Sequence, residues 1–162
     1  PSRTAVDLLP STIARLARHP RIVAIKEATG SSSRAREIAS TCPPEFVLLS
    51  GDDATAVELM GVGARGVISV TANVAPRRMH EVCKAALAGD LAAARTMDAS
   101  LQPLHKDLFV EANPIPVKWA VARMGIIGNA IRLPLVELAS AHHETVLRAM
   151  RAAGITLEDQ AA

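Results

Sequence analysis

The sequence is poor in aromatic residues, because its 162 residues include two Phe, one Trp and no Tyr. Its core must therefore be built from Ala, Val, Ile and Leu, which suits helices packed on strands. Net charge is also small, with 18 Lys and Arg against 16 Asp and Glu, and the scattered basic residues argue against nucleic-acid binding. No apolar run approaches the ~18 to 20 residues that cross a bilayer, and no secretory signal pattern is visible. We expect no membrane partner and a cytoplasmic location.

Cysteine is scarce as well. Cys42 and Cys83 lack the spacing of metal ligands, and two cysteines are a weak basis for a disulfide framework, so we expect reduced thiols without a function. His142 and His143 lie in a predicted helix beside Glu144, where a solvated face is favoured over a metal site because further ligands are missing. We predict no metal.

The length of 162 residues fits one compact domain. The chain opens with Pro1 and has no initiator methionine, and "PSRTAVDLLP" is typical of a loop that runs into a helix. We therefore expect the sequence to be a piece of a longer protein.

Short apolar runs alternate with amphipathic stretches in the first half of the chain. The apolar, β-branched runs predict strands near 21–27, 46–50 and 66–70. Helices are expected at 11–19, capped by Ser11 or Thr12, and at 31–40 and 54–63. This order favours right-handed βαβ units and a parallel sheet whose apolar strands are covered on both faces.

After Asn73 the alternation ends and only helices are predicted, at 75–90, 91–109, 114–125 and 134–154. We divide the chain into 1–74, part of an α/β barrel or sheet, and 75–162, the last barrel helix and a C-terminal helical region. Three strands do not close a (β/α)₈ barrel, which needs eight, so the first half of such a barrel would be missing. An open doubly wound sheet is the alternative.

Two motifs have simple structural interpretations. "GVGARG" at 61–66 matches the dinucleotide fingerprint, but it follows a helix and precedes a strand, so a helix C-cap and turn is favoured. "SGDD" at 50–53 follows a strand and could face a site there. An N-cap by Asp52 or Asp53 for the next helix is the favoured interpretation.

Lys26 ends the strand "RIVAIK" and is the strongest candidate for chemistry. Strand alternation places Ala24 and Lys26 on one face, at the carboxyl end where parallel α/β folds hold their sites. Burial disfavours the charged form of an amine, so a buried lysine there could attack a carbonyl carbon. The alternative is a strand-end lysine that extends into solvent. The residues alone leave both hypotheses open.

Six strings in register resemble the dihydrodipicolinate synthase family, also called 4-hydroxy-tetrahydrodipicolinate synthases. They are "PSRT", "IKEATG", "LLSGDDA", "GVISVTANVAP", "PLHKDLFVEANPIPVKWA" and "IRLPLVEL", and the similarity runs from Pro1 to about Ile155. The resemblance implies the C-terminal part of a (β/α)₈ TIM barrel, with about three strands, followed by a helical extension. It also implies a homo-oligomer, usually a tetramer, that condenses pyruvate with aspartate 4-semialdehyde in lysine biosynthesis.

The same resemblance assigns roles to four residues. Lys26 matches the lysine that forms a Schiff base with pyruvate, so no cofactor other than this covalent imine is expected. Arg3 matches an arginine that holds a substrate carboxylate in its planar fork. Gly51 is expected to contact substrate, and Ile68 matches a residue whose backbone carbonyl faces the pyruvate adduct.

The family's proton-carrying tyrosine lies before Pro1, and its threonine pair and lysine-feedback site belong to the missing first half. We therefore expect a fragment that keeps the nucleophile, lacks the acid–base groups and turns over poorly. Uncovered strand edges favour an oligomer or an unstable monomer. Two alternatives stay open. One is another pyruvate-dependent enzyme of the superfamily, such as N-acetylneuraminate lyase or a 2-keto-3-deoxy sugar acid aldolase, and the other is a non-catalytic truncated product.

Overall fold

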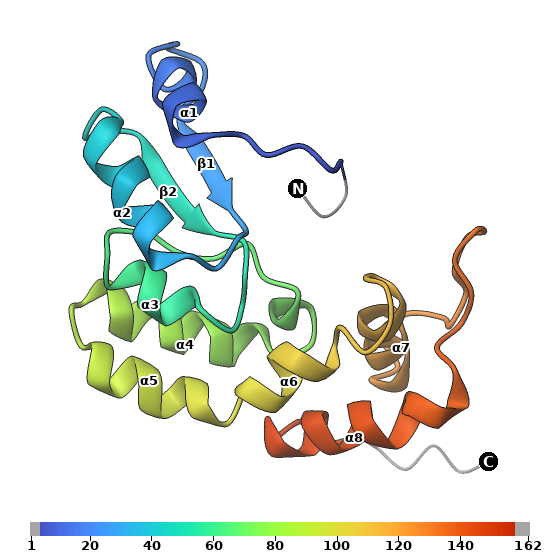
Figure 1. Cartoon of the computed structure of the whole chain (residues 1–162). Helices are drawn as coiled ribbons and strands as arrows, with labels where there is room; N and C mark the ends of the chain where they lie inside the picture. Colours follow the sequence, from blue (N-terminus) through green and yellow to red (C-terminus); the bar gives the residue numbers. More distant parts are fainter. Residues whose placement is uncertain (1–3, 158–162) are drawn as a thin grey trace.

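The computed structural model describes residues 4–157 and shows a small sheet with its helices at one end of the molecule and a helical layer at the other (Figure 1). Two elements, η1 and η2, are short 3-10 helices. The elements in chain order are α1 Pro10–Leu16, β1 Ala24–Glu27, α2 Ser32–Thr41, β2 Val47–Ser50, α3 Ala56–Met60, η1 Thr71–Asn73, α4 Pro76–Leu87, α5 Leu91–Ala99, α6 Gln102–Asp107, α7 Ile115–Arg123, η2 Ser140–His142 and α8 His143–Ala152.

The sheet is parallel, as the alternation of strands and helices predicts. Strands β1 and β2 pair with Lys26 opposite Leu49 and Glu27 opposite Ser50, and α2 forms the connection between them. Both strands are shorter than expected and lack the first residues of the predicted runs. The carboxyl ends of the two strands lie side by side, next to the helical layer (Figure 1).

The third predicted strand, at 66–70, is reduced to one parallel bridge between Ser50 and Val67, so the prediction of three strands was wrong. The ladder begins normally, because Ser50 N–H donates to the Gly66 carbonyl and Ile68 N–H donates to Ser50. Farther on, the Asp53 carboxylate accepts the N–H groups of Val70 and Thr71. Backbone donors held by a side chain cannot extend the sheet, and the chain turns into η1 instead.

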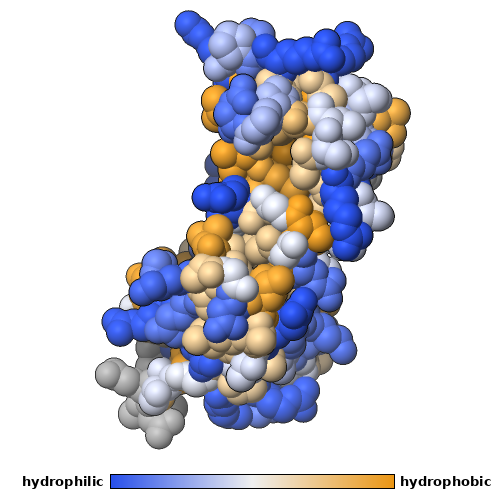
Figure 2. Space-filling model, turned by 90° about the vertical axis from the view of Figure 1, so that its left-hand side faces the viewer, coloured by the Kyte–Doolittle hydropathy of each residue, from blue (hydrophilic) through white to orange (hydrophobic). Residues whose placement is uncertain are grey.

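The expectation that both faces of the sheet are covered does not hold for the described residues. Of the apolar strand residues, Leu48 is buried at 4% exposed, and Val23 just before β1 is 65% exposed. The remaining ones are half-buried: Ala24, Ile25, Val47 and Leu49. Figure 2 shows hydrophobic residues gathered within a hydrophilic rim in the upper part of the molecule.

Two long helices of the sequence-based prediction are shorter or divided. The run 91–109 separates into α5 and α6 at Pro103, whose ring cannot follow an uninterrupted helix and instead occupies the first turn of α6. The run 134–154 is helical only from Ser140, because Glu111 Oε1 accepts the N–H of Ala139 at 3.0 Å and holds that backbone outside a helix.

The helix ends are formed by a serine, a glycine and a proline. Ser31 caps α2 by accepting the Arg34 N–H, and Gly61 ends α3, which confirms the helix-end interpretation of "GVGARG". Helix α1 instead begins at Pro10 with Leu9 as its N-cap, so the prediction of Ser11 or Thr12 was wrong. Proline has no N–H and a fixed φ, which makes it a favourable first helical residue.

The helical layer has a dense apolar core. Leu101, Leu104 and Leu108 around α6 and Val146 and Met150 of α8 are all 0% exposed. Helix α6 packs on α8, and α4 packs on α5 (Figure 1). Within the described residues, no helix combines the length and the hydropathy needed to span a bilayer.

Candidate active site at the carboxyl ends of the strands

Three of the predicted site residues meet where the strands end. Lys26 is the second-last residue of β1. Gly51 directly follows β2, and Ile68 directly follows Val67, which forms the single bridge to Ser50. Gly51 N–H donates to the Glu27 carbonyl at 2.7 Å, and Ile68 N–H donates to the Ser50 carbonyl at 2.8 Å. These ladder hydrogen bonds fix the order of the three residues along one edge of the sheet.

The absence of a side chain at Gly51 makes room for Lys26. A Cβ at Gly51 would lie 2.8 Å from Lys26 Cε and 2.9 Å from Lys26 Cγ, and 2.7 Å from Ala28 Cβ. All three distances are shorter than carbon atoms tolerate, so the lysine side chain passes directly over the glycine backbone. Gly51 therefore determines the path of the lysine side chain, whatever else it contacts.

The lysine itself is exposed, which agrees with the alternative of a strand-end lysine that extends into solvent and not with a buried amine. The described residues do not desolvate it, because β1 is an edge strand with β2 as its single partner. Ile68 is also 47% exposed. Arg3, the predicted carboxylate-binding residue, lies outside the described residues.

A hollow of about 210 Å³ adjoins the lysine. Its walls come from four parts of the chain: the segment 6–8, Ile13 of α1, the strand end with the turn that follows it, and Arg34 of α2. Lys26, Glu27 and Arg34 are among the lining residues.

The two aspartates of "SGDD" do not cap α3, whose N-cap is Thr55, so the favoured N-cap interpretation was wrong. Asp52 Oδ2 accepts hydrogen bonds from the N–H and the hydroxyl of Thr55 and thereby supports the turn before the helix. Asp53 Oδ2 accepts the N–H groups of Val70 at 2.9 Å and Thr71 at 3.1 Å. Asp53 therefore anchors the backbone that follows Ile68.

A series of buried side-chain hydrogen bonds connects the backbone after Ile68 to the helical layer. The sequence did not indicate it. Thr71 Oγ1 lies 2.7 Å from His105 Nδ1, and His105 Nε2 lies 3.0 Å from Asp98 Oδ1. Gln102 Nε2 donates to Asp98 Oδ2 at 2.5 Å. The first three residues are buried, so each hydrogen bond satisfies a group that water cannot reach. Helices α5 and α6 thus help to hold the Ile68 segment.

A second missed feature is the burial of Glu27, which is 4% exposed beside an exposed lysine. Burial raises the pKa of Glu27, but hydrogen bonds from Thr29 and Arg34 outweigh it and hold that pKa below its usual value. Neighbouring strand residues point to opposite faces. A charged pair such as Lys26 and Glu27 inside an apolar strand therefore indicates that one of the two is buried and needs a partner.

Cys42 and Cys83 are free thiols. Burial raises the pKa of Cys83, and the carboxylates of Asp53 and Asp98 raise it further, so the thiol stays protonated. Between residues 4 and 157, no group of three or more His, Cys, Asp or Glu side chains is placed to hold a metal ion.

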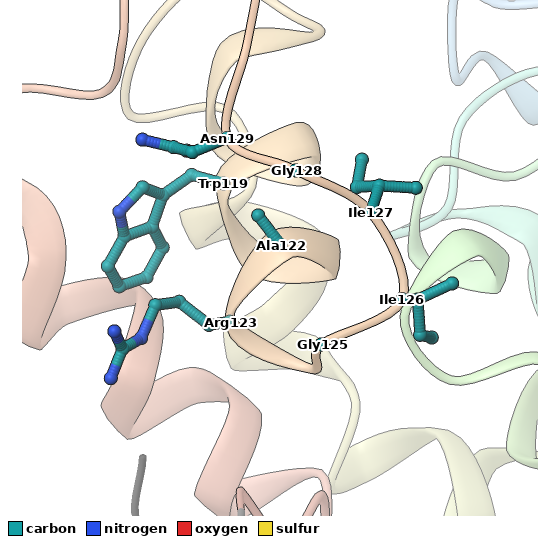
Figure 3. Close-up of a pocket in the computed structure, with 8 residues that line it drawn as sticks. All are labelled: Trp119, Ala122, Arg123, Gly125, Ile126, Ile127, Gly128 and Asn129. Carbon is teal, nitrogen blue, oxygen red and sulfur yellow. The ribbon is translucent and has the colours of Figure 1, made fainter. Parts of the chain in front are cut away.

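A larger hollow, of about 650 Å³, lies beside α7 and the loop after it (Figure 3). Trp119, Arg123 and Asn129 lie on one side of the helix, while Ile126 and Ile127 point to the other side. The Trp119 ring stacks on the half-buried ring of His143 with centroids 4.4 Å apart. Lys26, Gly51 and Ile68 do not line this hollow.

Comparison with known proteins places the chain in a family. A profile described as the dihydrodipicolinate synthetase family matches residues 1–153. The chain belongs to this family. It is 58% identical over 157 residues to a 4-hydroxy-tetrahydrodipicolinate synthase of Nitrosomonas eutropha, covering 97% of this chain and 54% of that relative. The corresponding enzyme of Methylococcus capsulatus is 57% identical over 96% of this chain and 53% of its own length.

Solved structures of dihydrodipicolinate synthases have the same fold over the shared part. The chloride-inhibited enzyme of Acinetobacter baumannii, complexed with pyruvate, matches with a TM-score of 0.93 and 49% identity over 96% of this chain and 54% of that one. The enzyme of Aquifex aeolicus matches with a TM-score of 0.94 and 39% identity over 98% of this chain and 55% of that one. The chain thus spans about half the length of the relatives and structures it matches.

Proposed function

We propose that this chain is the C-terminal part of a (β/α)₈ barrel with its helical extension, from a 4-hydroxy-tetrahydrodipicolinate synthase. The barrel forms a Schiff base between Lys26 and pyruvate and condenses it with aspartate 4-semialdehyde. The observation that carries the proposal is the meeting of Lys26, Gly51 and Ile68 at one sheet edge, with the lysine lying over the glycine. Membership of the family supports the choice of substrates.

The proposed chemistry begins with attack of the Lys26 amine on the pyruvate ketone. A C–N bond forms, water leaves, and the product is an imine that is protonated on nitrogen. This cation draws electrons from the neighbouring methyl group, which loses a proton to give an enamine. The enamine carbon then forms a C–C bond with the aldehyde carbon of the semialdehyde, while the aldehyde C=O π bond breaks and its oxygen takes up a proton to become a hydroxyl. The amine supplies the whole reactive group, and we propose no further cofactor.

Ile68 and Arg3 have binding roles in this proposal. The backbone carbonyl of Ile68, whose segment is anchored by Asp53, is proposed to face the pyruvate adduct. The Arg3 guanidinium is proposed to hold a substrate carboxylate, since a planar fork of donors matches a carboxylate. Homo-oligomerisation, the mode of assembly implied by the family resemblance, is proposed for the barrel.

The proposal also limits what this chain does alone. The sequence contains no tyrosine, so a phenolic proton carrier has to come from outside it. The lysine is exposed and not enclosed. We expect imine formation without efficient turnover.

Borohydride trapping with pyruvate tests the proposal. Borohydride delivers hydride to the C=N carbon and turns the imine into a stable secondary amine, which peptide mass spectrometry locates. The experiment uses this chain and any longer product of the same gene, with Lys118→Arg as a control away from the sheet. An adduct on Lys26 that Lys26→Arg abolishes is expected. No adduct in either product would reject both the synthase and its pyruvate-dependent relatives.

The second candidate is another pyruvate-dependent aldolase or lyase, because the imine chemistry is shared and the acceptor is not determined by the described residues. Assays with aspartate 4-semialdehyde, sugar acids and N-acetylneuraminate on a trapping-competent product separate the two. A non-catalytic truncated product is the remaining alternative, and it predicts no adduct on this chain.

A further inference from the structure

A charged cluster lies directly behind the lysine. Glu27, the next residue in β1, has its carboxylate buried, with Oε2 accepting from Arg34 Nε at 2.8 Å and Oε1 accepting from the Thr29 N–H at 2.6 Å. Arg34 lies in the first turn of α2. The strand end that carries Lys26 is thereby tied to the helix behind the sheet.

The same guanidinium reaches the other wall of the small hollow. Arg34 donates to both carboxylate oxygens of Asp7, at 2.9 Å and 3.0 Å, and also to the Leu8 carbonyl. Asp7 and Leu8 belong to the segment that leads from Arg3 to α1. One side chain therefore fastens two pieces of chain that are far apart in sequence.

A lysine at position 34 could not make these contacts. The Arg34 side chain is 16% exposed and directs its Nε and both terminal nitrogens to three different acceptor groups. An ammonium group is a single point with rotating donors, whereas a guanidinium is a rigid planar fork. Burial lowers the pKa of Arg34, but its bonds to Glu27 and Asp7 outweigh this and raise that pKa above its usual value.

The separation of the two walls is set by these contacts. The 210 Å³ hollow is lined by Asp7 and Leu8 on one side and by Lys26 and Glu27 on the other, with Arg34 also in its wall. The segment 6–8 contains the exposed residues Val6, 70% exposed, and Leu8, 41% exposed. Apolar burial therefore contributes little to holding this segment in place, and the polar contacts with Arg34 carry that role.

We propose that Arg34 is a positioning residue that sets the distance and orientation between the Lys26 amine and the segment that follows Arg3. This inference rests on the proposed imine chemistry of Lys26. Arg34 does not touch the substrate, because its donors are directed to protein acceptors. It acts through Glu27 on the strand end and through Asp7 on the opposite wall.

The test measures the rate of borohydride trapping at Lys26 as a function of pyruvate concentration in Arg34→Lys, Arg34→Met and the unmodified protein. Arg36→Lys is the matched control, because Arg36 is exposed on the same helix. We expect both Arg34 variants to lose on the order of 10-fold to 100-fold in trapping rate at saturating pyruvate. Arg36→Lys should behave like the unmodified protein.

The lysine variant distinguishes positioning from general support of the fold. If Arg34 only supplied charge to a folded α2, Arg34→Lys would restore the trapping rate, which would overturn the inference. Helix content and denaturant unfolding are measured for each variant. If the Arg34 variants do not fold, Asp7→Asn releases the segment 6–8 while keeping the Arg34–Glu27 pair, and it is expected to lower the trapping rate in the same direction.

The remaining outcomes separate this inference from the proposed function. Folded Arg34 and Asp7 variants that trap pyruvate as fast as the unmodified protein would overturn the positioning role and leave the imine chemistry intact. An unmodified protein that forms no adduct on Lys26, in this chain and in any longer product of the same gene, would overturn both.

Discussion

The sheet end and the helical end of this molecule are packed very differently. In the helical layer, Leu104 and Met150 are 0% exposed. In the sheet, four of the five apolar residues of the two strands are only half-buried, and Val23 beside them is 65% exposed. The helices bury their apolar faces against one another, whereas a two-stranded parallel sheet needs other elements to cover both of its faces.

The difference shows where stability and chemistry reside. The helical layer supplies the close-packed core, and the sheet end carries the exposed lysine and the hollow beside it. Polar contacts connect the two ends. The buried Asp98–His105–Thr71 chain runs from α5 and α6 to η1, behind the Ile68 backbone.

The largest expected effect is in the helical core. Leu104→Ala should reduce the free energy of unfolding by about 2–5 kcal/mol, because a fully buried side chain leaves a cavity. Leu49→Ala, the same change at a half-buried strand position, should reduce it by less than half as much. Chemical denaturation measures both. Equal losses would contradict the contrast between the two ends.

The second-largest effect on stability is expected from the hydrogen bonds that connect the two ends. His105→Ala should cost about 1–3 kcal/mol of unfolding free energy, since Thr71 and Asp98 each lose a buried hydrogen-bond partner. His80→Ala, at an exposed position of α4, is the control and should change stability little. If the His105→Ala protein were as stable as the control, the Asp98–His105–Thr71 hydrogen bonds would contribute nothing to the free energy of unfolding.

A steric change at the site should have a comparable effect on stability and a specific effect on chemistry. Gly51→Ala places a Cβ within 3 Å of Lys26 and Ala28, so overpacking should cost about 1–3 kcal/mol. Pyruvate trapping at Lys26 should fall as the lysine is displaced. Gly128→Ala is the control, because nothing lies within 4 Å of its Cβ. Unchanged trapping in Gly51→Ala would refute the close approach.

A smaller effect is expected on acid stability. The pKa of Glu27 is held below its usual value by Thr29 and Arg34, so the unfolded chain takes up this proton first as the pH falls. The contribution of Glu27 is therefore present above the usual carboxyl range and is lost at about pH 4 and below. Glu27→Gln should flatten this part of the stability curve measured by thermal unfolding. Glu144→Gln, at an exposed pair with Arg151, should leave it unchanged.

The smallest effect is expected at the uncovered edge. Val23→Thr should change the unfolding free energy by less than about 0.5 kcal/mol, because the side chain is 65% exposed. The same change at Val82, which is 1% exposed, should cost several times more. A large loss at Val23 would mean that this strand end is covered in solution, for example by a second copy.

Much of this organisation could be predicted from the sequence, for identifiable reasons. β-branched runs between amphipathic stretches predict the parallel pair, and the position of Lys26 at a strand end places it at the site. Local capping was less predictable, since Pro10 rather than Ser11 begins α1. The prediction of a third strand failed because Asp53, a residue distant in sequence, accepts hydrogen bonds from the backbone N–H groups of Val70 and Thr71.

By itself, the sequence determined the order of elements, the parallel pairing and the residue types at the strand ends, because these depend on periodicity and on neighbours along the chain. Only the tertiary structure decided that Gly51 makes room for the lysine and that Arg34 joins Glu27 to Asp7. It also decided that His105 supports η1 through Thr71. Those contacts join residues that are separated in the chain, and their distances exist only after the helices and strands have packed.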